Sequence, residues 1–219
     1  MMVEVIVALA RLLSGANVRW IGCIPDSSQR IYFANHTSNL DTLVLWAALP
    51  PEARAQTRPV AARDYWATGR LRPYLAKRIF NAVLIERKKV TARDNPIEQM
   101  LAVLEEKYSL IIFPEGGRQV GPGMAPFKSG LYHLAKKRPD VEFIPVLIDN
   151  LNRILPKGEV LPVPVLSCIS FGAPIRLEVN ETKAAFLERA RESVNRLRPR
   201  RNSNSTNRRS GWWAASSGF

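Results

Sequence analysis

Short apolar runs alternate along the chain with longer segments in which apolar residues recur every three or four positions. The short β-prone runs are typical of strands, and the segments with the longer period are typical of amphipathic helices. The sequence predicts strands at residues 30–34, 58–62, 82–85, 109–113, 143–148 and 165–171. It predicts helices at 40–49, 96–107, 127–137 and 182–197, and a helix in pieces at 65–80, broken at Gly69 and Pro73.

Strands that alternate with helices indicate the α/β class, with a mainly parallel or mixed central sheet flanked by helices. The length of 219 residues suits a single domain of this kind. Residues 109–113 are almost entirely apolar, as expected for a strand that is buried on both faces of the sheet. In such folds, binding and catalytic residues collect at the carboxyl ends of the strands.

The N-terminal segment, residues 3–13, is apolar but holds only about half of the ~20 residues that a membrane-spanning helix requires. Its two charged residues, Glu4 and Arg11, are seven positions apart and so lie on one face of a helix. Two interpretations are open: a helix packed on the body of the protein, or a helix lying in a membrane interface. We expect an N-terminal helix at 1–20, the main domain at 21–198 and a disordered basic tail at 199–219.

The formal net charge is +13, and the part of the chain from Arg196 onward contributes six arginines and no acid. A basic protein favours anionic partners, namely nucleic acid, acidic lipid surfaces or phosphorylated substrates. No helix-turn-helix, RNP or zinc-finger pattern occurs, so a nucleic-acid-binding module is only a minor alternative. The sequence also has no Cys/His cluster at metal-ligand spacing, and we expect no metal and no cofactor.

A histidine and an aspartate follow the predicted strand 30–34 in the segment Asn-His-Thr-Ser-Asn-Leu-Asp, residues 35–41. The five-residue spacing of His36 and Asp41 places them on different faces of a helix, so they can meet only if His36 lies in a turn and Asp41 in the first helical turn. Ser38 or Asn39 could serve as the N-cap of that helix. A carboxylate on one ring nitrogen orients a histidine whose other nitrogen can then accept a proton from a hydroxyl.

Three further segments follow predicted strands or form one. Residues 113–118, Phe-Pro-Glu-Gly-Gly-Arg, combine glycines that allow close backbone approach with an arginine suited to phosphate or carboxylate. Residues 84–89 end a strand with Glu86, Arg87 and two lysines, and residues 144–148 are apolar around Pro145. Each segment alone is compatible with an ordinary loop, a solvated basic turn or a core strand.

Taken together and in this order, the four segments resemble the motif blocks of the glycerolipid acyltransferase family, the lysophosphatidic acid acyltransferases and their relatives. Residues 35–41 resemble the first block, NHxSxxD, and 84–87 resemble the end of the second, GxxFIxR. Residues 113–118 resemble the third, FPEGTR, and 141–148 resemble the fourth. Residues 126–130, Pro-Phe-Lys-Ser-Gly, also resemble the PFKxG that often follows the third block. The resemblance spans roughly residues 30–175 and implies a single domain with the glycerol-3-phosphate acyltransferase-like fold.

The resemblance implies a catalytic dyad of His36 as general base and Asp41 as its orienting partner. It implies that Arg87, Glu115, Gly116 and Arg118 hold the phosphate end of the acceptor, with Lys128 as a further candidate. The implied reaction moves a fatty acyl group from acyl-CoA or acyl carrier protein to the hydroxyl of a lysophospholipid, 1-acylglycerol-3-phosphate, in phospholipid biosynthesis. No GxSxG elbow occurs, which agrees with direct transfer rather than an acyl-enzyme.

The chain departs from the family pattern at Asn81 and Leu84 in the second block and at Gly117 and Gln119 in or after the third. These departures leave other acceptors open: a lyso-aminolipid, another alcohol or glycerol 3-phosphate. A thioesterase that delivers the acyl group to water is a further alternative. The basic body and apolar N-terminus fit a peripheral or monotopic enzyme on an anionic membrane surface, on the cytoplasmic side, where each cation near the surface contributes about 1 kcal/mol.

Overall fold

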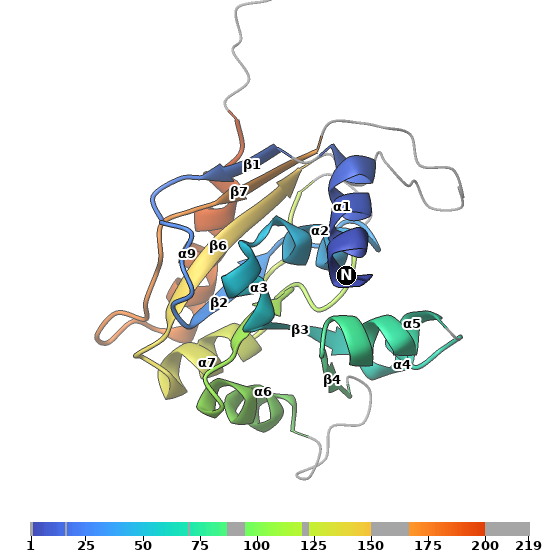
Figure 1. The fold of residues 1–219 in the computed structure, drawn as a ribbon. Helices are drawn as coiled ribbons and strands as arrows, with labels where there is room; N and C mark the ends of the chain where they lie inside the picture. The colour runs from blue at the N-terminus through green and yellow to red at the C-terminus, as the bar shows by residue number, and fades with distance from the viewer. Residues whose placement is uncertain are drawn as a thin grey trace, which may run out of the picture.

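The computed structural model describes residues 2–15, 17–69, 71–86, 95–119, 123–149 and 167–199. Its centre is a seven-stranded mixed sheet in the order β1-β7-β6-β2-β5-β3-β4 (Figure 1). Every neighbouring pair is parallel except β6 and β7, which run antiparallel. This is the α/β architecture that the alternation of strands and helices predicts.

The strands lie close to their predicted positions, with one addition. The bounds are β1 Asn17–Trp20, β2 Arg30–Ala34, β3 Thr57–Ala62, β4 Val83–Ile85, β5 Ser109–Ile112, β6 Glu142–Asp149 and β7 Cys168–Phe171. Strand β1 is the addition: it pairs with β7 at the sheet edge, and Trp20 stacks on Phe171 at 4.0 Å between ring centroids. It therefore belongs to the sheet, although it lies within the segment that the sequence assigns to the N-terminal helix.

The helices also follow the predicted pattern. The bounds are α1 Met2–Ser14, α2 Asp41–Ala48, α3 Pro51–Ala55, α4 Arg63–Trp66, α5 Leu71–Tyr74, the π-helix η1 Leu75–Ile79, α6 Pro96–Glu105, α7 Gly130–Lys137 and α9 Lys183–Asn195. Helix α3 is an addition, because Pro51 both ends the preceding helix and starts a new one as its first residue. The predicted break at Gly69 is confirmed, since no helix crosses it and its φ is +76°. The predicted break at Pro73 is wrong, because Pro73 lies in the first turn of α5, where a missing N–H leaves no intrahelical bond unmade.

Two hydrophobic cores cover the two faces of the sheet. Successive side chains of β2 point to opposite faces, so Tyr32 and Ala34 enter one core and Ile31 and Phe33 enter the other. The first core contains residues of α1, α2, α3 and η1, and the second contains residues of α6, α7 and α9. All five residues of β2 are buried, which is why this stretch reads as a continuous β-prone run.

Helix α1 packs on α2 through one apolar face and leaves a second apolar face uncovered. Val7 and Ala10 are buried in the first core, whereas Val5, Leu9 and Leu12 are 54%, 50% and 76% exposed. Packing on the body of the protein is therefore confirmed, and the outward face leaves the membrane interpretation open as well. No helix in the described ranges is long and apolar enough to cross a bilayer.

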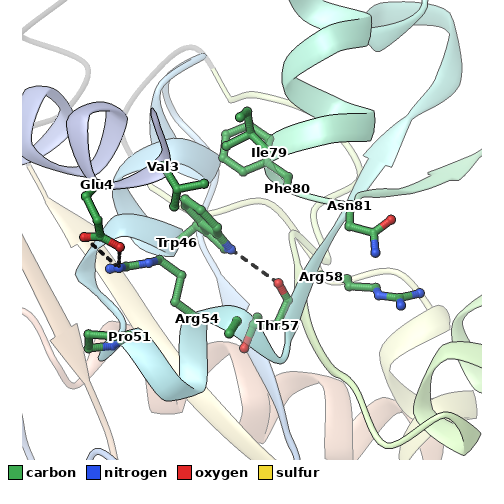
Figure 2. Close-up of a pocket in the computed structure, with 11 residues that line it drawn as sticks. Val3, Glu4, Trp46, Pro51, Arg54, Thr57, Arg58, Ile79, Phe80 and Asn81 are labelled. Atoms are coloured by element: carbon green, nitrogen blue, oxygen red, sulfur yellow. Dashed lines mark hydrogen bonds and ion pairs between the residues drawn. The ribbon is translucent and has the colours of Figure 1, made fainter. Parts of the chain in front are cut away.

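Asn81 adopts a left-handed backbone conformation, with φ of +47°. The resembling family has glycine at this point, and asparagine is the residue that best tolerates the same conformation. Asn81 lines a pocket of about 250 Å³ between α1, α2, α3, β3 and the end of η1 (Figure 2). Asparagine in place of the family's glycine at residue 81 is therefore compatible with the left-handed backbone conformation.

We expect Asn81→Ala to lower the free energy of unfolding by about 1 kcal/mol, because alanine pays the full penalty of a left-handed φ. Asn81→Gly should recover most of that loss relative to alanine. Urea unfolding monitored by circular dichroism measures both variants. Asn195→Ala, the same substitution at the end of helix α9, is the control, and an equal loss at both positions would contradict the assignment.

Candidate active site

The strand order brings the chemically distinctive segments together at the carboxyl ends of neighbouring parallel strands. Strand β2, which precedes His36, pairs in parallel with β5, which precedes Glu115. Strands β3 and β4 follow β5 in the sheet, also parallel. Because parallel strands end on the same side, the loops after β2, β5, β3 and β4 stand in a row.

His36 and Asp41 form a hydrogen-bonded pair. The Nδ1 of His36 lies 2.8 Å from Oδ2 of Asp41, and since a carboxylate only accepts, the imidazole is held with Nδ1 protonated and Nε2 as the free acceptor. The Asp41 side chain is fully buried, and that of His36 is 20% exposed. The buried carboxylate therefore orients the histidine, and the imidazole keeps part of its surface open to solvent.

The turn before α2 is organised around the same carboxylate oxygen. The backbone N–H groups of Thr37 and Ser38 donate to Asp41 Oδ2 over 2.6 and 2.8 Å. The expectation that Ser38 or Asn39 occupies the N-cap position is wrong, because Leu40 is the N-cap residue and makes no side-chain cap bond. Ser38 still contributes to the start of the helix, since its Oγ accepts from the backbone N–H of Leu40 at 3.2 Å. Asp41 satisfies the N–H groups of Thr37 and Ser38, which orients its carboxylate toward His36.

Glu115 connects the turn after β2 to the loop after β5. Its Oε1 accepts from the backbone N–H of His36 at 2.8 Å, and its Oε2 accepts from the backbone N–H of Ala125 at 2.9 Å. The side chain is buried, and this burial raises the pKa of Glu115 despite the two N–H donors, which lower it. A second link is the N–H of Gln119, which donates to the carbonyl of His36 at 2.9 Å.

Phe113 supports the imidazole from the side. Its ring stacks on that of His36 with centroids 4.3 Å apart and planes inclined by 24°. Asp41 bonds to the Nδ1 of His36, and Glu115 bonds to its backbone N–H. With the ring contact from Phe113, these bonds restrict the histidine to one orientation.

Gly116 and Lys128 lie against each other. Gly116 has φ of +72°, and a Cβ there would stand 2.5 Å from Cε and 2.7 Å from Nζ of Lys128. The left-handed backbone therefore favours glycine here, and a Cβ would also displace the end of the Lys128 side chain from its present position. At Gly117 an added Cβ would meet nothing within 4 Å of the described atoms, so the departure from threonine there is not forced by packing.

The remaining predicted residues are placed as follows. Arg118 is exposed, with Cζ 5.7 Å from the ring centroid of Tyr65. Arg87 lies outside the described residues. Strand β4, which ends at Ile85 just before it, is three strand positions from β2, or roughly 14 Å at the usual strand spacing.

Three residues that sequence reasoning gave no role also shape the site. The buried side chain of Asn35 hydrogen-bonds to both backbone groups of Ile148. Its Nδ2 donates to the carbonyl oxygen at 2.9 Å, and its Oδ1 accepts from the N–H at 2.8 Å. Phe113 stacks on the histidine, and Tyr65 donates its hydroxyl to Oδ1 of Asn39 at 2.7 Å. Asn35 and Phe113 stand inside the recognised segments, but Tyr65 carries no sequence signal because its contact depends on the strand order.

Comparison with known proteins agrees with this geometry. A family model described as acyltransferase matches residues 16–149, which contain the histidine–aspartate turn and the glycine loop. The chain belongs to the acyltransferase family.

Individual members of the family are about 30% identical to the chain over the aligned residues. The 1-acyl-sn-glycerol-3-phosphate acyltransferase of Haemophilus influenzae is 29% identical over 139 residues, which are 58% of this chain and 52% of that protein. The protein of the same name from Limnanthes douglasii is 30% identical over 166 residues, 69% of this chain and 55% of that protein. The chain thus spans about half the length of the curated relatives it matches.

Among solved structures, the 1-acyl-sn-glycerophosphate acyltransferase PlsC from Thermotoga maritima has the same fold. Its crystal structure matches with a TM-score of 0.69, covering 89% of this chain and 77% of that chain at 21% identity. The sheet, the flanking helices and the position of the family motifs at one sheet edge therefore form the acyltransferase fold.

We expect Glu115→Gln to lower the free energy of unfolding by roughly 1–3 kcal/mol, because the amide NH₂ would face one of the two backbone donors and leave it unpaired. Urea unfolding at neutral pH measures the change. Glu98→Gln is the matched control, since Glu98 makes an exposed ion pair with Lys137 that should contribute no more than about 1 kcal/mol. A Glu115→Gln midpoint equal to that of the control would refute the bracing role.

Proposed function

We propose that this protein is an O-acyltransferase that moves a fatty acyl group from acyl-CoA or acyl carrier protein to the hydroxyl of 1-acylglycerol-3-phosphate. The observation that carries the proposal is the 2.8 Å contact between Nδ1 of His36 and the buried carboxylate of Asp41. It leaves Nε2 as a base held by a rigid frame. The names of the relatives support the acceptor, and membership of the acyltransferase family supports the reaction type.

In the proposed reaction, Nε2 of His36 takes the proton of the acceptor hydroxyl as its oxygen attacks the thioester carbonyl. The C–O bond forms, the C–S bond breaks, and the imidazolium returns the proton to the departing thiolate. Asp41 stabilises the imidazolium between these two transfers. The chain needs no metal or other cofactor for these steps.

We further propose that Arg118, Lys128 and Arg87 bind the acceptor phosphate, as cations do. Glu115 and Gly116 belong to the same site in a different way. Both oxygens of Glu115 are bonded to backbone N–H groups, which supports a contribution through the position of the loop. Gly116 contributes by admitting the stem of Lys128.

The test is thiol release from palmitoyl-CoA with and without 1-acylglycerol-3-phosphate. Release by the wild type should require the acceptor and should vanish in His36→Ala. Asp41→Asn should reduce the rate by about 10²–10⁴-fold, because an amide neither fixes the productive tautomer nor stabilises the imidazolium. His133→Ala is the control, since this histidine lies on α7 and should leave the rate unchanged.

Other results would change the assignment. Release that ignores the acceptor would indicate a thioesterase, and release with lyso-aminolipid or glycerol 3-phosphate but not with 1-acylglycerol-3-phosphate would replace the acceptor. Full activity in His36→Ala would refute the mechanism.

We also propose that α1 docks the protein on an anionic membrane surface, on the cytoplasmic side. The charged residues of α1 are exposed but bond to the body of the protein: Glu4 pairs with Arg54 at 3.0 Å, and Arg11 donates to the carbonyl of Ala47 at 3.1 Å (Figure 2 shows the first pair). Its exposed stripe is apolar and consists of Met2, Val5, Leu9 and Leu12. An apolar face held outward in this way, on a strongly basic chain, suits a lipid interface.

Replacing Leu9 and Leu12 by glutamate should weaken co-sedimentation with anionic liposomes by at least about tenfold, because each leucine loses its burial in lipid and gains a like charge near the surface. Binding of the wild type should also weaken as salt rises. Val179→Glu is the control, since Val179 is 92% exposed in the loop before α9. Wild type that stays in the supernatant at low salt, or a double variant that binds like the control, would refute the docking.

A further inference from the structure

A basic and aromatic cluster lies beside the turn of His36 and Asp41. It consists of Arg118, which ends the third motif block, and of Tyr65 and Arg72, which lie outside the motif blocks. The guanidinium carbon of Arg72 is 4.3 Å from the ring centroid of Tyr65, and that of Arg118 is 5.7 Å from the same centroid. The two cations therefore lie within about 10 Å of each other, close to one Debye length at physiological salt, so their repulsion is only partly screened.

Neither guanidinium is neutralised by an acid of the described chain. Arg72 donates to the hydroxyl of Thr68 at 3.1 Å, and Arg118 is exposed. The ion pairs between described residues include neither of them, whereas many other arginines, such as Arg30, Arg54 and Arg189, are paired. Two unneutralised cations held on one tyrosine ring form a site that an anion would complete.

The cluster is fixed to the reacting centre from two sides. The Tyr65 hydroxyl donates to Asn39, which stands in the turn between His36 and Asp41. Arg118 stands in the loop whose Gln119 N–H donates to the carbonyl of His36. An anion at the cluster would therefore be held beside the base and not at a remote surface.

The position of Tyr65 is set by the core. Its neighbour Trp66 packs edge-to-face on Phe80 at 5.9 Å, and Phe80 packs in the same way on the buried Trp46 at 5.1 Å. Helix α4 follows β3, which pairs with β5, so the tertiary structure delivers Tyr65 next to the loop of Arg118. The ring is thus a fixed platform for both guanidinium groups.

We propose that Arg72 and Tyr65, together with Arg118, bind a phosphate group of a substrate, with Arg72 as a binding residue and Tyr65 as the positioning residue between the two cations. The inference rests on the proposed function for the identity of the substrates. Since Arg118 is proposed above to bind the acceptor phosphate, the acceptor head group is the expected source. The 3′-phosphate of CoA is the other source of the same chemistry, and the experiment separates the two. Two planar guanidinium groups that contact the same ring suit the several oxygens of a phosphate monoester.

The test measures binding without turnover. Isothermal titration gives the dissociation constants of glycerol 3-phosphate, a probe of the acceptor head group, and of adenosine 3′,5′-bisphosphate, a probe of the donor. Arg72→Gln should weaken one of the two by about tenfold or more, and Arg72→Lys by less, because it keeps the charge and loses the fork. Arg78→Gln is the matched control, since it removes the same charge from an exposed residue of the adjoining η1.

The two substrates are then separated by kinetics. Arg72→Gln should raise the KM of the substrate whose probe it weakened more than it lowers kcat, and Tyr65→Phe should be milder than Tyr65→Leu because it keeps the ring. A wild type that binds neither probe, or an Arg72→Gln variant that binds both as tightly as Arg78→Gln, would overturn the site. If no acyl transfer is found with any acceptor, the proposed function fails, while the titrations still decide whether the phosphate site exists.

Discussion

Strand β2 has no free edge and no free face, and the geometry of the site depends on this confinement. It pairs with β5 on one side and β6 on the other, and all five of its residues are buried. Asn35 extends the pairing by one residue with its side chain, because it bonds to both backbone groups of Ile148. The histidine that follows therefore starts from a rigid position. The proposed role requires this, because a base must meet the acceptor hydroxyl within hydrogen-bond distance.

The charged groups around the histidine divide into two kinds. Asp41 and Glu115 are buried, and backbone N–H groups donate to Oδ2 of Asp41 and to both oxygens of Glu115, so both side chains help to fix the surrounding backbone. Arg118 and Lys128 are exposed on the same loops and are available to a ligand. Buried acids therefore orient the imidazole, while exposed cations make the surface beside it favourable to anions, as the proposed function requires.

Helix α1 differs from an ordinary surface helix in which of its faces are buried and which are exposed. An ordinary surface helix hides its apolar stripe and exposes its charges. In α1, Val7 and Ala10 face the core, Glu4 and Arg11 bond to the body, and a second apolar stripe remains outside. The sequence shows the composition of this helix and the shared face of its two charges, but which apolar stripe is covered depends on where α2 and α3 lie.

The sequence alone determined most of the helices and strands and the pairing of His36 with Asp41, because these depend on local pattern. Strands 30–34 and 109–113 are recognised by their apolar runs, and His36 and Asp41 meet across a single turn. The sequence did not predict strand β1, because a four-residue strand carries little periodic signal. It also missed the start of α3, because the proline pair at its N-terminus indicates only the end of the preceding helix. Only the tertiary structure decided the order β2-β5-β3-β4 and with it the meeting of Tyr65 and Arg72 with Arg118. Strand order is set by which buried faces pack together across long sequence separations, and no local pattern records that choice.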